Sequence, residues 1–223
     1  MMTGRRFLLL LPIPLLLWMM VQAGISGYSY LIQYRTNAAL ENWQEEGVQP
    51  SFQAWQDLER SALTALSWDS MQPELLNAIG RLYGFRALRL AEMKDEKDQD
   101  LQHAAHYYRQ VMKLRPAWPY GYLNLALLKA NAGVLDAEFS GLLVHLTRLA
   151  PWDEKTLPLM VQMITRGWPY ISVADRAELK PYLLLAARLR TNEVRMALQE
   201  YHSVNFFCAI INGKQPSKIC GAL

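Results

Sequence analysis

The sequence predicts an all-α protein in which an N-terminal transmembrane helix is followed by a solenoid of helix pairs with an irregular C-terminal helical cap. Pro116 and Pro151 lie 35 residues apart, and Gly133 and Gly167 lie 34 apart. A period near 34 is typical of stacked helix pairs. No charged side chain occurs in the run 7–34, which is long enough to cross a bilayer.

Composition favours a folded chain and gives no support for a nucleic-acid partner. Hydrophobic residues make up 52% of the 223 positions and include seven Trp, which is ample for a core. The formal charge is only +3, and Arg5 and Arg6 supply two of those charges before the apolar run. The remainder is close to neutral, so the sequence gives no electrostatic support for a nucleic-acid partner.

Residues 1–35 are predicted to be a membrane anchor or a signal segment. Arg5 and Arg6 precede the apolar run and acidic residues follow it, which favours a cytoplasmic N-terminus and an exported body. A cleaved signal peptide is the alternative, because Ala23 and Gly24 resemble a small-residue cleavage site. The uncharged run continues well beyond a normal signal core, which favours a retained anchor over cleavage. A buried core helix is disfavoured because Arg5 and Arg6 give the run the flank of a targeting segment.

Residues 36–50 are predicted to be a linker with a short helix at 38–43, broken by the segment 47–50. The helical-repeat domain is expected over 51–211. Ser51 begins its first helix, in which Trp55 and Leu58 belong to an apolar stripe at three- and four-residue steps.

Pro73 occupies a preferred first helical position, and the helix that it begins is expected to reach about Glu92. The charged cluster 94–100 is predicted to be a solvated turn with an acidic start to the next helix. That helix runs through Ala104 and Leu114 and is stopped by Pro116.

The helices from Pro73 onward resemble the tetratricopeptide repeat. Positions that match the pattern of its two helices, with about a dozen residues inserted at the turn, are Leu76, Ile79, Gly80, Tyr83, Ala104, Tyr108, Val111 and Pro116. Matches in the next repeat are Tyr122, Asn124, Leu125, Ala126 and Gly133. Glu138 stands where the family has Ala, so the helix around Phe139 is expected to pack in a shifted register. Small residues such as Gly80 and Ala126 let helices approach closely.

The pattern degrades after Pro151, as expected of a capping end. A further first helix covers 157–164, and two short helices, 174–179 and 182–189, are predicted on either side of Pro181. A last helix is expected from Glu193 to about Ile211, followed by a tail at 212–223.

Cys208 and Cys220 are the two cysteines of the chain. In an oxidising compartment they are expected to pair and close a short loop. Two separate thiols, one buried and one in a loose tail, remain the alternative. No metal-type Cys spacing accompanies them.

No metal, cofactor or catalytic centre is predicted. Asp100, His103 and His106 are spaced by three on one helix, but we expect both histidines to face solvent rather than to bind a metal. The sequence has no nucleophile elbow, phosphate loop or zinc-protease motif. Its carboxylates cluster in turns, so a glycosidase-like acid and base pair is not indicated, and we expect the protein not to be an enzyme.

The candidate partner-binding residues lie on the first helices of successive pairs. They are Asn77, Arg81, Tyr120, Asn124, Leu127 and Asn131. An amide both donates and accepts hydrogen bonds, which suits recognition of a peptide backbone. An equally good interpretation is that Asn124 bonds only a neighbouring helix. For the tryptophans, packing in the core or at helix corners is favoured over sugar stacking.

The helix array, the segment from Leu114 to Ala130, the Arg-Gly-Trp-Pro sequence at 166–169 and the cysteine tail together resemble the VpsP-type proteins of bacterial exopolysaccharide gene clusters. The resemblance implies a single-pass bacterial inner-membrane protein with a periplasmic main domain. Its partners would be other proteins of the envelope polysaccharide machinery, which it would hold together without catalysis. A glycan-acting envelope enzyme that uses carboxylates and an assembly factor for surface appendages are the alternatives.

Overall fold

The computed structural model describes residues 12–45, 47, 49–90, 93–211 and 217–220. All regular structure in these ranges is helical, which confirms the predicted fold class. The elements are α2 (Pro12–Glu45), α3 (Phe52–Trp68), α4 (Pro73–Arg89), α5 (Lys94–Leu114), α6 (Pro119–Ala132), α7 (Ala137–Leu149), α8 (Thr156–Gly167), the 3-10 turn η1 (Trp168–Tyr170), α9 (Val173–Leu189), α10 (Thr191–Glu200), α11 (Val204–Ile210) and α12 (Ser217–Cys220).

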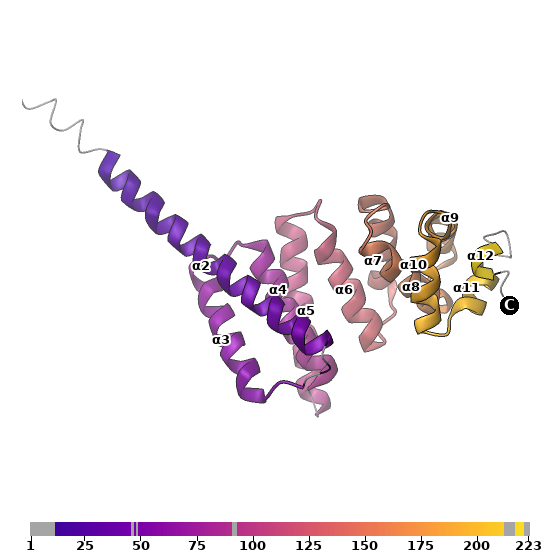
Figure 1. Ribbon diagram of the computed structural model, residues 1–223, viewed down its shortest axis with the longest axis horizontal. Helices are drawn as coiled ribbons and strands as arrows, with labels where there is room; N and C mark the ends of the chain where they lie inside the picture. The colour runs from indigo at the N-terminus through magenta and orange to yellow at the C-terminus, as the bar shows by residue number, and fades with distance from the viewer. Residues whose placement is uncertain (1–11, 46, 48, 91–92, 212–216, 221–223) are drawn as a thin grey trace, which may run out of the picture.

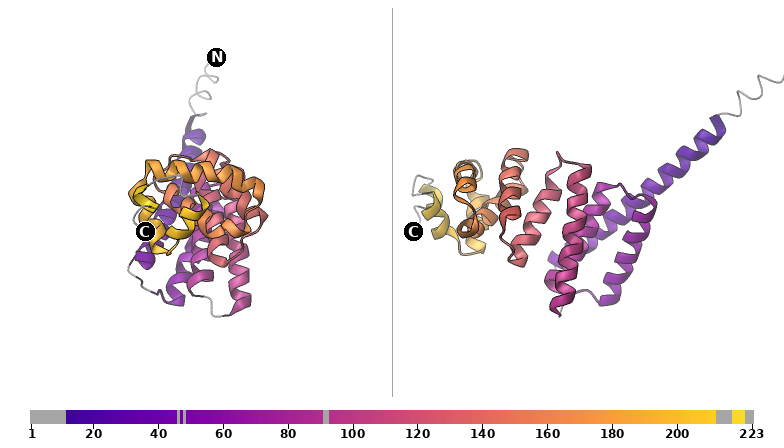
Figure 2. Two further views of the ribbon diagram at one scale, coloured as in Figure 1. Left: turned by 90° about the vertical axis from the view of Figure 1, so that its right-hand side faces the viewer. Right: turned by 180° about the vertical axis from the view of Figure 1, so that it is seen from behind.

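The helices stack as successive pairs into an elongated array (Figures 1 and 2). Helices α2, α4, α6, α8 and α10 each contact the next and form a continuous row, called here the first-helix row. Helices α3, α5, α7 and α9 pack beside that row. Pro116 and Pro151 both stand two residues after the end of a second helix, so they occupy equivalent positions, as their spacing predicts.

Helix α2 is both the candidate membrane helix and the first member of the first-helix row. It runs for 34 residues, or about 50 Å, without a break at the expected boundary between residues 35 and 36. Its N-terminal half projects from the array (Figure 1), and Met20 is 70% exposed there. In the other half Ile32, Thr36 and Leu40 are buried at four-residue steps, and this half packs on α3 and α4.

Helix α2 is long and apolar enough from Ile13 to Gln44 to cross a membrane. Together with the disulfide described below, this suggests a single-pass membrane protein whose array lies on an oxidising side. The segment 38–43, expected to be a helix of its own within a linker, is instead the last part of α2. Arg5 and Arg6 lie outside the described residues.

The predicted start of α3 is confirmed, because the Ser51 hydroxyl accepts a hydrogen bond from the Ala54 N–H at 3.2 Å. Pro73 is likewise the first residue of α4. The cluster 94–100 is not a turn, since α5 begins at Lys94. The extra residues of this repeat therefore lengthen α4 and α5 instead of forming a long turn, and the two helices extend past the edge of α6 and α7 (Figure 1).

Gly80 provides the close helix contact that the repeat pattern predicts. A Cβ atom on Gly80 would lie 2.6 Å from Cε1 of Tyr108, whose ring is buried between α4 and α5. Only a residue without a side chain fits at that distance. Gly167 plays the same role against Phe139, since a Cβ atom on Gly167 would lie 2.6 Å from Cε1 of that ring.

Glu138 departs from the repeat pattern because it links three helices. Its carboxylate accepts two hydrogen bonds from Arg109 of α5, at 2.9 and 2.8 Å, and one from Lys129 of α6 at 2.9 Å. Hydrogen bonds from Arg109 hold the pKa of Glu138 below its ordinary value, against partial burial and with further help from Lys129. Two residues earlier, Asp136 caps α7 through the Phe139 N–H.

Replacing Glu138 with Gln is expected to lower stability at neutral pH by about 1 kcal/mol, a small value because the side chain is partly exposed. A carboxylate whose folded-state pKa is depressed stabilises the fold above its unfolded pKa, and this contribution is lost as pH falls through the folded pKa. The difference in melting temperature between wild type and Glu138→Gln should therefore begin to shrink as pH falls below about 4, and it should vanish once Glu138 is protonated in the folded state. Asp98→Asn, an exposed control, should show no such pH-dependent difference. A difference that persists undiminished in acid would contradict the assignment.

Two predictions for the C-terminal cap are wrong. Pro181 does not split a helix, because α9 runs unbroken from Val173 to Leu189. Because Pro181 has no N–H, the carbonyl of Ala177 lacks its hydrogen-bond donor within the helix. Both residues lie on the exposed face of α9, where water can bond to that carbonyl. Burial of Leu179 and Leu183 on the opposite face keeps the helix together.

The expected last helix from Glu193 to Ile211 is also divided, into α10 and α11. His202 has a φ of 51°, and the Ser203 N–H donates to the Leu198 carbonyl at 2.9 Å. This is the bonding of a helix end in which the left-handed residue is normally Gly. The same end at Gly133, with a φ of 76°, is marked in the sequence, whereas His202 gives no such signal.

Cys208 and Cys220 form a disulfide with a Cα–Cα distance of 5.8 Å, as predicted. The bond ties α12 to α11 at the end of the array. Closing a loop of this size should stabilise the fold by about 3 kcal/mol. We expect reductant to lower the melting temperature of the wild type, measured by circular dichroism. The double variant Cys208→Ser, Cys220→Ser should melt at a lower temperature than the oxidised wild type, and reductant should not change that temperature. An unaltered wild-type melt under reducing conditions would contradict this contribution.

Candidate functional site

The six predicted partner-binding residues all line one groove along the first-helix row. The groove has a volume of about 610 Å³ and lies over α4 and α6, with the end of α2 and the start of α8 at its margins. Asn77 and Arg81 come from α4, and Tyr120, Asn124 and Leu127 come from α6, as does Asn131. First helices of successive pairs stand side by side, so residues about one repeat apart in sequence are brought together here.

Asn124 and Asn77 are bonded to each other across the groove floor. The Asn124 amide donates to Oδ1 of Asn77 at 2.8 Å. This supports the interpretation that Asn124 bonds a neighbouring helix, but it does not use up either amide. Each side chain carries both a carbonyl oxygen and an NH₂ group, and this bond takes one group from each. The bond holds the two side chains in place relative to each other.

The groove carries positive charge. Arg81, Arg89 and Lys155 line it, and the described residues that line it include no Asp or Glu. Arg81 donates to Oδ1 of Asn37 at 2.8 Å and lies 3.9 Å from the Glu41 carboxylate, so helix α2 orients it and partly balances its charge. Arg89 and Lys155 are exposed.

Apolar side chains complete the groove, among them Leu127 and Leu159, which are half-buried.

Three polar residues of the groove were not predicted from the sequence, namely Gln44, Arg89 and Lys155. Gln44 lies at the end of a helix whose C-terminal part was expected to be a linker, and Lys155 lies in a turn, so neither followed from the first-helix pattern.

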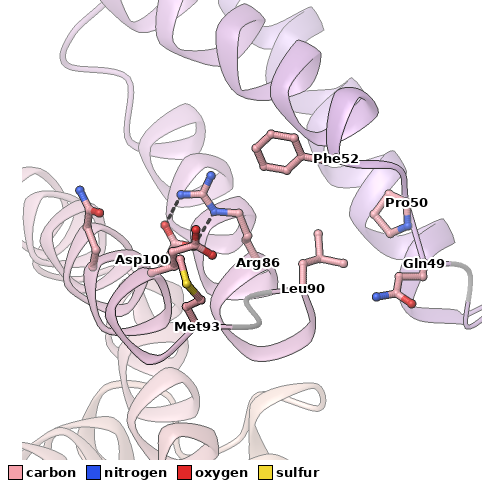
Figure 3. A pocket seen from close by; sticks show the side chains of 9 residues that line it. Gln49, Pro50, Phe52, Arg86, Leu90, Met93 and Asp100 are labelled. Atoms are coloured by element: carbon pink, nitrogen blue, oxygen red, sulfur yellow. Dashed lines mark hydrogen bonds and ion pairs between the residues drawn. The ribbon is translucent and has the colours of Figure 1, made fainter.

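A second cavity, of about 590 Å³, lies where the segment 49–52 meets the ends of α4 and α5 (Figure 3). Arg86 projects into it and forms a two-pronged ion pair with Asp100. Asp100 is fully buried, which corrects its placement in a solvated turn. Burial disfavours the charge of Arg86, but the hydrogen bonds to Asp100 outweigh burial and raise its pKa above the ordinary value.

Aromatic rings surround this ion pair. The Arg86 guanidinium carbon lies 3.8 Å from the centre of the Trp55 ring, which is fully buried. Tyr83 donates to Oε1 of Glu59 at 2.6 Å, and its ring meets that of His103 at a centroid distance of 5.0 Å. Burial, followed by the hydrogen bond to Glu59, raises the pKa of the Tyr83 hydroxyl. Both Asp100 oxygens accept hydrogen bonds from Arg86.

The histidines of α5 do not converge with Asp100. His103 packs on Tyr83 and is half-buried, so its expected exposure is wrong, whereas His106 is exposed and contacts Gln110 at 2.9 Å. The described residues contain no cluster of three or more metal-ligating side chains.

The carboxylates Asp136 and Glu138 have shifted pKa values, and both shifts are downward. For Asp136, burial acts to raise the pKa, but hydrogen bonds from Lys129 and the Phe139 N–H outweigh burial. A general acid needs the opposite shift.

The tryptophans are divided between the core and exposed corners, since Trp55 is buried whereas Trp68 and Trp152 are 57% and 62% exposed.

No protein-family model matches the sequence, and no curated protein matches it either. A solved structure of the human IFIT1 dimer with PPP-AAAA is similar over 86% of this chain, with 12% sequence identity and a TM-score of 0.39. This chain covers 48% of that protein, or about half of its length. The contacts between successive helix pairs themselves define a tetratricopeptide-like helical array, and the part of the chain that the structure describes contains one candidate membrane helix.

Proposed function

We propose that this protein is a membrane-anchored scaffold whose groove binds an extended segment of a partner protein in the bacterial envelope. The observation that carries this proposal is the single groove that contains all six candidate residues, Arg81 among them, together with the further cationic side chains Arg89 and Lys155. Amides, cations and half-buried leucines in one long depression suit an extended acidic peptide. The role is non-enzymatic: the chain presents a surface and holds a partner near the membrane.

The partner class that we propose is the exopolysaccharide synthesis or export machinery of the inner membrane. The support is the sequence resemblance to VpsP-type proteins, together with the candidate membrane helix and the disulfide, which suits a periplasmic array. The N-terminus would then be cytoplasmic, in line with the arginines that precede the apolar run.

The test is photo-crosslinking in cells from a reactive residue placed at Leu127, inside the groove. A matched probe at Val173, which is 81% exposed at the start of α9, reports nonspecific capture. We expect a polysaccharide synthesis or export protein to be captured from Leu127 and not from Val173. The double variant Arg89→Glu, Lys155→Glu should reduce that capture several-fold, since it reverses the groove charge. Arg188→Glu, on the exposed surface of α9, is the charge control.

Equal capture from both positions would contradict a groove-bound partner. Specific capture of a pilus component instead would keep the scaffold and replace the polysaccharide assignment with appendage assembly.

A further inference from the structure

Helix α2 leaves the array at a surface that is apolar and aromatic. Tyr30, Leu31 and Tyr34 are 50%, 54% and 71% exposed on this part of α2, while Ser29 and Ile32 face the array and are buried. A helix that met only water here would be expected to carry polar side chains on its free face.

The turn between α3 and α4 lies at the same level. The Trp68 and Tyr28 rings have a centroid distance of 5.2 Å, and the turn is seen beside α2 where α2 leaves the array (Figures 1 and 2). Trp68 is 57% exposed, and Met71 at the end of the turn is 68% exposed. Two large side chains, far from Tyr30 in sequence, thus extend the same exposed surface.

The end of the apolar run sets the depth of this surface. The headgroup layer is about 5 to 7 Å thick, or about four helical residues. Counted back along α2 from Arg35, this layer begins near Tyr30. Arg35 is the first charged residue after the run and lies just beyond that depth.

We propose that Trp68 and Met71 insert into the interfacial layer of the membrane leaflet that α2 leaves. Trp and Tyr favour this layer because their rings are apolar and their N–H or O–H groups stay hydrated. Asp69 and Ser70, in the same turn, suit headgroup depth and not the hydrocarbon. The inference rests on the proposed membrane anchoring and adds a second contact point, which fixes the tilt of the array on the bilayer.

The test uses nitroxide spin labels on the full-length protein in phosphatidylcholine and phosphatidylglycerol nanodiscs. The native cysteines are paired, so a label attaches only to an introduced cysteine. Labels at Met71→Cys and Ser70→Cys report the turn, Val21→Cys reports the span, and Trp152→Cys is an exposed control in the turn between α7 and α8. Collision rates with oxygen, which enters lipid, and with a water-soluble nickel complex are measured at each position.

We expect the ratio of oxygen to nickel collisions at Met71 to be several-fold higher than at Trp152 and lower than at Val21, with Ser70 agreeing in direction. A lipid-like Val21 with a water-like Met71 would overturn the inference and leave the anchor intact. A Met71 label shielded from both reagents would also overturn it, since a protein partner would then cover the turn. A water-like Val21 would remove the membrane anchor itself.

Discussion

Replacing Asp100 with Ala is expected to destabilise the array by about 3 kcal/mol, because it leaves the Arg86 guanidinium without its partner in a largely buried site. For a chain of this size that corresponds to a fall in melting temperature of about 6 to 12 °C. Circular dichroism of the detergent-solubilised full chain measures the change.

Two further variants separate the ion pair from a general effect on α5. Asp98→Ala changes an exposed carboxylate two residues away and should shift the melting temperature little. The double variant Arg86→Met, Asp100→Leu should regain most of the loss, since no charge is left unpaired. Equal melting temperatures for Asp100→Ala and Asp98→Ala would contradict the buried pair.

Replacing Trp55 with Ala is expected to destabilise by about 3 to 5 kcal/mol. The fully buried ring packs edge-on against Tyr83, and its Nε1–H donates to the Leu82 carbonyl at 3.2 Å. The ring also supports Arg86, so its removal weakens the contact of α3 with α4. The melting temperature measured as above should fall by about 10 °C.

Trp55→Phe is the matched control, since it keeps one aromatic ring and loses the N–H donor together with part of the indole volume. A loss of about 1 to 2 kcal/mol is expected, which is smaller than the loss for Ala. A Phe variant as unstable as the Ala variant would contradict a dominant contribution from the packed ring at this position.

The fold was largely predictable because the signals that define it are local. Apolar side chains recur at helical spacing, Pro73 and Ser51 mark helix starts, and Gly80 marks a close contact. Where prediction failed, a longer-range effect decided the outcome. Pro181 does not end α9, because burial of the opposite helix face keeps the helix together. The helix end at His202 was missed because histidine, unlike glycine, does not mark a left-handed backbone position in the sequence.

The candidate site was predictable to the extent that it follows the helix-pair pattern. All six candidate residues are on first helices, and these helices align in one row. The Arg86–Asp100 pair was not predictable, because Asp100 belongs to a charged segment whose composition is typical of a solvated turn. Only the structure shows that α5 begins before Asp100 and packs this residue against Arg86 of α4. Gln44 joins the groove only because α2 continues into the array.

The continuity of α2 gives the scaffold its main mechanical property. One helix supplies both the candidate membrane span and the first member of the first-helix row. With α2 in a bilayer, as proposed, the groove would be held by a continuous helix and not by a flexible tether. A flexible tether would let a bound partner sample many orientations, whereas this arrangement presents it in one.

The central claim is tested most directly by the distance between a spin label at Met20→Cys, in the projecting half of α2, and one at Gln102→Cys on α5. Pulsed electron resonance in nanodiscs should give one narrow distance distribution. Insertion of a Gly-Ser segment after Gly24 supplies the broad reference expected of a flexible joint. A native distribution as broad as that reference would contradict a single helix that joins the membrane to the array.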